Sequence, residues 1–122
     1  MLFRSVAFRL PPFSDGNARR LEHRVSGAEA NPYLVTAAVL AGVHYGLTTK
    51  GDPGAKHGGN AGAEVDESLP LTLWDALAAL RSADILPKYI GADYLEMYGA
   101  VKSAEFNDFM EEISAREYRW YL

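Results

Sequence analysis

The stretch Arg19-Arg20-Leu21-Glu22-His23-Arg24 decides how the first part of this chain folds. Because successive side chains of a β-strand point to opposite faces, a strand here places Arg20, Glu22 and Arg24 on one face. Two guanidinium groups beside one carboxylate suit a site that holds a phosphate or carboxylate together with a divalent cation. The alternative is a solvent-facing strand whose charges alternate for solubility and for pairing with a neighbouring strand.

A second extended segment precedes this stretch. Residues 4–10 are rich in apolar side chains and predict a first strand, which the prolines at 11 and 12 end because proline lacks the N–H that a strand ladder needs. Residues 14–17, Ser-Asp-Gly-Asn, predict a turn, and a second strand follows over about 18–25. The two segments therefore predict an antiparallel hairpin, which needs further strands or packing to be stable.

The rest of the chain predicts helices. Asn31 and Pro32 form a good helix opening, and the helix that follows is apolar on nearly all sides, which predicts burial. Residues 48–70 form a long polar, glycine-rich loop. Further helices are predicted from the capping residue Thr72, over about 84–90, from Tyr94 to about Ile113, and after the capping pair Ser114 and Glu117. The expected fold is α+β: an N-terminal antiparallel hairpin followed by four or five helices, in one incomplete domain over residues 1–122.

Charge is distributed unevenly along the chain. Residues 1–24 carry a net charge of +3, whereas the remaining 98 residues carry −7, which gives −4 for all 122 residues. An acidic body with an arginine-rich beginning disfavours a general nucleic-acid binder, whose basic surface would be broader. No apolar run reaches the roughly 18 residues that a membrane span needs. The absence of cysteine and of a signal-peptide pattern leads us to expect a cytoplasmic protein.

Two further arginines, Arg4 and Arg9, lie in the first expected strand and can converge on the face that carries Glu22. Four arginines near one carboxylate make poor core material, because burying unpaired charge is expensive. All the early basic residues are arginine, which favours planar, bidentate contacts with an anion. His23 points to the opposite face and is expected to pack rather than to bind a ligand.

Three stretches in this order resemble the C-terminal part of the glutamine synthetase family. They are Arg4-Ser5-Val6-Ala7-Phe8-Arg9-Leu10-Pro11, Asn17-Ala18-Arg19-Arg20-Leu21-Glu22-His23-Arg24 and Ala30-Asn31-Pro32-Tyr33-Leu34. A helical tail that closes on an aromatic Glu-Tyr motif completes the likeness, which covers essentially the whole chain. The Glu-His-Arg form of the charged row resembles the γ-glutamylpolyamine synthetases of that family.

The resemblance implies a role for each charged residue. Arg4, Arg9 and Arg20 match arginines on the nucleotide side, which contact ATP. Glu22 matches the carboxylate that ligates an active-site Mg²⁺ or Mn²⁺, and Arg24 matches the catalytic arginine that holds glutamate and the transferred phosphoryl group. The implied enzyme is an oligomeric ligase that phosphorylates the γ-carboxylate of glutamate with ATP and then joins ammonia or an amine to it. Such chemistry requires charge neutralisation and alignment, which guanidinium groups and a divalent ion supply.

Several features of the family have no counterpart in this sequence. Phe3 stands where the family commonly has asparagine, and the other carboxylate ligands, the histidine ligand and the ammonium-binding acid are absent. The isolated chain is therefore expected to be inactive and to need the missing N-terminal part of the ligase. The alternative hypothesis is a catalytically inactive, family-derived module for oligomerisation or interaction.

Overall fold

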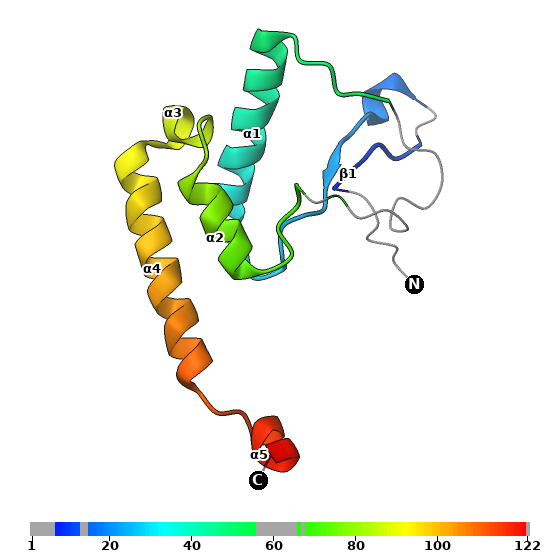
Figure 1. The fold of residues 1–122 in the computed structure, drawn as a ribbon. Coiled ribbons are helices and arrows are strands. Elements are labelled where there is room, and N and C mark those ends of the chain that lie inside the picture. The colour runs from blue at the N-terminus through cyan, green and yellow to red at the C-terminus, as the bar shows by residue number, and fades with distance from the viewer. Residues whose placement is uncertain (1–6, 13–14, 56–65, 67, 122) are drawn as a thin grey trace. The chain divides into compact units, whose positions relative to one another are not determined.

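A computed structural model of the chain describes residues 7–12, 15–55, 66 and 68–121 (Figure 1). The chain divides into two compact units, Met1–Asp66 and Glu67–Leu122, and each is described here by itself. Within the described residues, a two-stranded antiparallel hairpin precedes five α-helices, which confirms the expected α+β class. The elements are β1 (Phe8–Arg9), η1 (Gly16–Ala18), β2 (Glu22–His23), α1 (Pro32–Thr49), α2 (Leu73–Arg81), α3 (Leu86–Ile90), α4 (Ala92–Glu111) and α5 (Ala115–Tyr121).

The hairpin is shorter than the sequence predicted. Each strand has two residues, and Phe8 pairs with His23 while Arg9 pairs with Glu22. The Arg24 N–H extends the ladder by donating to the Ala7 carbonyl at 2.9 Å. Two-stranded ribbons are marginal without further strands, so regular pairing here covers only a few residues. Residues 4–6 of the expected first strand lie outside the described residues.

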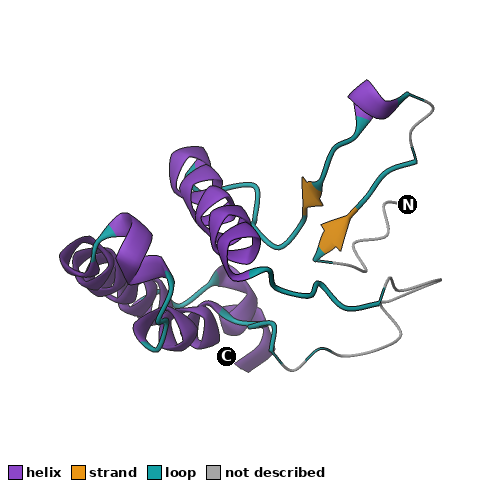
Figure 2. Ribbon diagram, turned by 90° about the horizontal axis from the view of Figure 1, so that it is seen from above, coloured by secondary structure: helices purple, strands orange, loops and turns teal. Residues whose placement is uncertain are grey.

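A 3₁₀ turn occupies the position where the second strand was expected to begin. The Asp15 carboxylate accepts a hydrogen bond from the Asn17 N–H at 3.2 Å and caps this turn, which is the typical behaviour of aspartate at a turn. Figure 2 shows the two strands side by side, with η1 at the turn end of the hairpin. The prediction of a strand over 18–25 was therefore wrong at its beginning, and Arg20 lies outside β2.

Capping hydrogen bonds define both ends of helix α1. The Asn31 side chain accepts hydrogen bonds from the N–H groups of Tyr33 and Leu34 at 3.0 and 3.3 Å, and Pro32 occupies the first turn. Lys50 ends the helix in the left-handed conformation, at φ 52° and ψ 41°, and its N–H bonds to the Gly46 carbonyl. The left-handed residue and this hydrogen bond form a common type of helix end.

The prediction that α1 is buried was wrong for the structure of this chain. Among its described residues only Ala41 is buried, whereas Tyr33 is 84% exposed. No charged side chain occurs between Ala30 and Thr49, so water contacts an apolar helix surface on several sides. The described residues do not supply the surfaces that would cover it.

The second unit is built around the packing of α2 on α4. Thr72 caps α2 through the Asp75 N–H at 3.1 Å and donates to the Asp75 carboxylate at 2.7 Å. Leu77 is buried, and the rings of Trp74 and Phe106 lie 6.2 Å apart between the two helices. Figure 1 shows α2 beside α4, with α3 at one end of α4 and α5 beyond the other.

Turn and capping residues set the boundaries of the last helices. Gly91 separates α3 from α4 at φ 99°, a conformation that side-chain-bearing residues rarely adopt. The Ser114 N–H donates to the Glu117 carboxylate at 2.7 Å, and the Ser114 hydroxyl accepts from the Glu117 N–H at 3.3 Å. This reciprocal pair is the predicted capping box, and it starts α5 after the three residues that separate it from α4. Within the described residues, no helix combines the length and apolarity that a membrane crossing requires.

The left-handed Lys50 predicts a stabilising substitution. An L-residue in this conformation costs about 1–2 kcal/mol, whereas glycine costs about 0.5–1 kcal/mol in backbone entropy. Lys50→Gly should therefore raise the free energy of unfolding by about 0.5 kcal/mol, measured by urea unfolding followed by circular dichroism. The matched control Ala37→Gly, inside the exposed helix, should lower it by about 1 kcal/mol. A loss of stability in Lys50→Gly would contradict this account of the helix end.

Candidate functional site

The register of the hairpin brings three charged side chains together. Because Arg9 lies directly opposite Glu22, its Nη1 approaches Glu22 Oε2 at 3.2 Å across the two strands. Arg24 reaches the same oxygen from along its own strand, with Nη2 at 2.8 Å and Nε at 3.2 Å. We call Arg9, Glu22 and Arg24 the charged cluster. It joins one carboxylate to two guanidinium groups on one face of the hairpin.

The two oxygens of Glu22 have different environments. All three hydrogen bonds from the guanidinium groups end on Oε2, and Oε1 accepts none from the residues that the structure describes. The Glu22 side chain is 32% exposed and that of Arg24 is 18% exposed, so the cluster lies at the surface but is partly shielded from water. The hydrogen bond from Arg24 lowers the pKa of the Glu22 carboxyl against the opposing effect of desolvation, and the charge of Arg9 lowers this pKa further. The two guanidinium groups therefore favour the carboxylate form of Glu22.

On the opposite face of the hairpin, the side chains pack against each other. The rings of Phe8 and His23 face each other with centroids 5.3 Å apart, and the Ser26 hydroxyl lies 3.5 Å from His23 Nδ1. Alternation along the strand predicted this side for His23. The ring contact with Phe8 agrees with the expected packing role, and the serine contact was not anticipated because it arises from the bend after β2.

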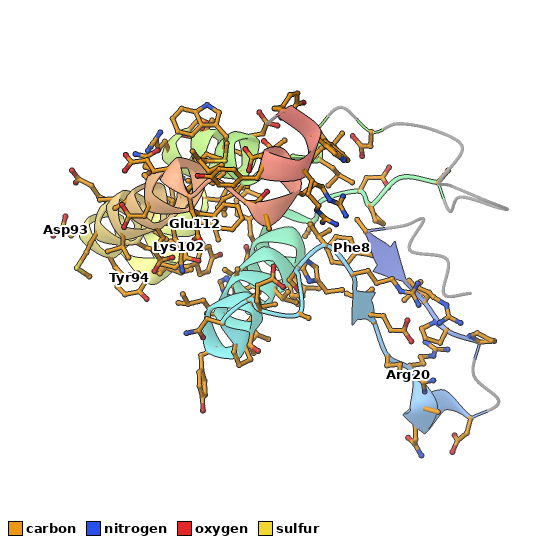
Figure 3. All side chains as sticks on the ribbon, turned by 90° about the horizontal axis from the view of Figure 1, so that it is seen from below. Phe8, Arg20, Asp93, Tyr94, Lys102 and Glu112 are labelled. Carbon is orange, nitrogen blue, oxygen red and sulfur yellow. The ribbon has the colours of Figure 1, made fainter. Side chains whose placement is uncertain are left out.

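The remaining predicted site residues are not part of the charged cluster. Arg20 precedes β2, is exposed, and makes no hydrogen bond with Glu22 within the described residues. Figure 3 shows Arg20 near the turn end of the hairpin and Phe8 farther along the ribbon. The predicted row of Arg20, Glu22 and Arg24 is thus corrected: Arg9, from the other strand, makes the second contact to Glu22 instead. Arg4 lies outside the described residues.

Glu22 has the chemistry of a ligand for a hard cation, but it is one ligand only. Carboxylate oxygens suit Mg²⁺ and Mn²⁺, and an octahedral ion needs several such donors or waters. In the described part of the chain, no group of three or more His, Asp or Glu side chains is close enough to hold a metal ion. A metal ion at Glu22 would therefore need ligands in addition to this carboxylate.

The charged cluster predicts a measurable titration. Because the folded-state pKa of Glu22 lies below its ordinary value of 4.5, the cluster stabilises the fold at higher pH. This contribution is lost as the pH falls through the folded-state pKa. In Arg24→Ala the pKa of Glu22 should rise towards its ordinary value, and in Arg9→Ala it should rise less, as measured by carboxyl ¹³C NMR. The control Arg20→Ala should leave it unchanged, and an equal rise there would show that Arg20 belongs to the cluster.

Comparison with known proteins gives a consistent result. The family model described as "Glutamine synthetase, catalytic domain" matches residues 3–121. Gamma-glutamylputrescine synthetase PuuA of Escherichia coli is 36% identical over 98% of this chain and 25% of its own length. Glutamate–isopropylamine ligase of a Pseudomonas species is 31% identical over 89% of this chain and 24% of its own. A glutamine synthetase of Halobacterium salinarum is 31% identical over 98% of this chain and 28% of its own.

Two of these relatives are named synthetases and one is named a ligase, and the chain spans about a quarter of their length. The match extends through both units, so it includes the charged cluster as well as the helices. The resemblance stated from the sequence is confirmed. The hairpin, its charged cluster and the helices that follow therefore belong to a member of the glutamine synthetase family, within its catalytic domain.

Proposed function

We propose that this chain is the C-terminal portion of the catalytic domain of an ATP-dependent glutamate–amine ligase. Its residues 1–122 would form one incomplete domain that contributes part of an active site. Family membership supports the ligase class, and relatives named for putrescine, isopropylamine and methylamine support an amine or ammonia as the second substrate. The same names support glutamate as the first substrate.

The observation that carries the proposal is the charged cluster itself. Glu22 is held ionised by Arg9 and Arg24 on one oxygen, while the other oxygen accepts no hydrogen bond from the described residues. A carboxylate in this state can ligate Mg²⁺ or Mn²⁺, and the adjacent guanidinium groups can bind phosphate oxygens. An ion-pair cluster with a purely structural role could use both oxygens of Glu22, whereas here both arginines contact Oε2.

Each arginine has a role consistent with its position in the sequence. Arg4 and Arg9 bind the phosphates of ATP, and Arg20 lies on the nucleotide side of the site. Arg24 is the catalytic residue that holds glutamate and the phosphoryl group in transfer. A divalent ion held in part by Glu22 would supply charge neutralisation for the phosphate groups. The γ-carboxylate oxygen of glutamate takes the terminal phosphoryl group and ADP leaves. The amine nitrogen then attacks the carbonyl carbon, phosphate leaves, and the amine proton passes to solvent or to a base outside this chain.

The proposed enzyme is larger than this chain. Because Glu22 is a single ligand, the other metal ligands and the amine site come from residues outside the described part. The apolar surface of α1 supports burial against the rest of such a domain. We further propose a cytoplasmic homo-oligomer. The 122-residue chain alone should release no phosphate from ATP in the presence of glutamate and an amine.

A chimera tests the catalytic proposal. The matching quarter of the Escherichia coli gamma-glutamylputrescine synthetase is replaced by this chain, and ATP-dependent γ-glutamyl amide formation is measured. The chimera should be active, and Arg24→Lys should lower kcat by about 100-fold or more, because lysine loses the planar, bidentate geometry. Glu22→Gln should raise the Mg²⁺ concentration needed for half-maximal rate.

The control Arg119→Lys, in α5, should keep the parent activity. Oligomeric state and circular dichroism establish that each chimera folds before its rate is compared. A folded chimera in which Arg24→Lys and Glu22→Gln retain full activity would contradict the assigned roles. A folded chimera that assembles but is inactive before any substitution would favour the inactive interaction module instead.

A further inference from the structure

One side of helix α4 packs against α2, and the opposite side carries exposed apolar side chains. Phe106 lies near Trp74 of α2, and Ser103 accepts a hydrogen bond from Arg81 Nη2 at 2.8 Å. Gly99, one turn before Ser103, is buried. Because residues advance by about 100° around a helix, these three positions fall on one side of α4. That side faces α2.

Opposite this contact, α4 carries a line of exposed apolar side chains. We call Tyr94, Met97, Val101 and Ala104 the α4 strip. Their spacing of three, four and three residues places them together, about 180° from the side that faces α2. Met97 is 59% exposed and Val101 is 49% exposed, although both are side chains that proteins ordinarily shield from water. Figure 3 shows Tyr94 and its neighbour Asp93 projecting outward at the beginning of α4.

The spacing of the α4 strip is that of a helix-packing seam. Positions 94, 97, 101 and 104 follow the a and d pattern of a heptad, and Asp108 interrupts the next a position. The seam therefore extends for about three helical turns, or about 16 Å. Methionine adapts its shape to different partners, and such seams receive helices through anchors at these intervals.

The charged residues around the α4 strip indicate which charge a binding partner should carry. Helix α4 carries five acidic residues and one basic residue, Lys102, which is paired with Glu105 in the described structure. Asp93 and Glu111 border the strip on one side, and Asp108 follows it in line. Neither Asp93, Asp108 nor Glu111 takes part in an ion pair among the described residues. The edge of the strip is therefore acidic and not neutralised by its own helix.

We propose that the α4 strip binds an amphipathic helix of a protein partner that carries basic residues beside its apolar face. Apolar side chains of the partner cover Met97 and Val101, and its lysines or arginines approach Asp93, Asp108 and Glu111. This interaction surface is independent of the charged cluster on the hairpin. A second copy of α4 fits poorly, because two acidic helices would repel each other. An anionic membrane surface is disfavoured for the same reason.

Two synthetic helical peptides test this proposal. Both carry the same apolar heptad pattern over three to four turns, with lysine at all flanking positions in one and glutamate in the other. The ¹⁵N-labelled chain is titrated with each peptide. The lysine peptide should shift the amide signals of residues 93–108 and bind more weakly as salt concentration rises. The glutamate peptide should produce no comparable shifts.

Two variants separate the apolar and electrostatic parts of the binding. Val101→Asp should weaken binding of the lysine peptide by about tenfold or more, since it removes a central apolar anchor. Its matched control Asn107→Asp adds the same charge away from the centre of the strip and should bind at least as tightly as the parent. The combined change Asp93→Asn, Asp108→Asn and Glu111→Gln should reduce both the affinity and its salt dependence. Circular dichroism verifies that each variant keeps its helices.

Three results would overturn the proposal. The first is equal binding of the two peptides, which would remove the requirement for basic residues. The second is the absence of shifts within residues 93–108 at saturating lysine peptide. The third is a dimer of the chain in sedimentation experiments that Val101→Asp dissociates, which would show that a second copy occupies the strip.

Discussion

The cross-strand pairing of Arg9 with Glu22 is the interaction on which the functional reading of this chain depends. It fixes which side chains meet on the charged face, because a shift of one residue would place Glu22 opposite Phe8 or Leu10 instead of Arg9. It also brings a guanidinium group from β1 to a carboxylate already bound by Arg24. A hairpin of two-residue strands can specify this geometry because the charged contacts and the ring contact act on opposite faces of the same register.

Few apolar side chains are buried in the described part of the chain. Ala41 and Leu77 are the buried apolar side chains among the described residues of the helices, whereas helices α1, α4 and α5 expose large apolar side chains. Local chemistry nevertheless specifies these helices: Asn31 begins α1, Thr72 begins α2, and the Ser114–Glu117 pair begins α5. Helix formation here depends on caps and propensity more than on a core. The relatives that the chain matches are about four times its length.

Most helix boundaries were predictable because their signals are local. Gly91 separates α3 from α4, and the capping residues lie where their hydrogen bonds require. The lengths of the strands were not predictable from local signals. Strand pairing depends on the side chains of the neighbouring strand, and the alternation of polar and apolar residues along one strand does not reveal them. The expected burial of α1 depends likewise on surfaces beyond its own sequence. Arg20 was grouped with Glu22 by alternation, but the capped turn at Asp15 delays the start of β2 until after Arg20.

The sequence by itself determined the order of the elements, the helix caps and the family to which the chain belongs. These follow from short motifs whose physical effects act over one or two turns. Only the tertiary structure decided that Arg9 rather than Arg20 contacts Glu22, and that one Glu22 oxygen accepts all three guanidinium bonds. The same holds for the side of α4 that packs on α2. The reason is that strand register and helix packing depend on contacts between segments that are distant in sequence. The free energy of such a contact depends on both segments, so the sequence of one segment does not determine it.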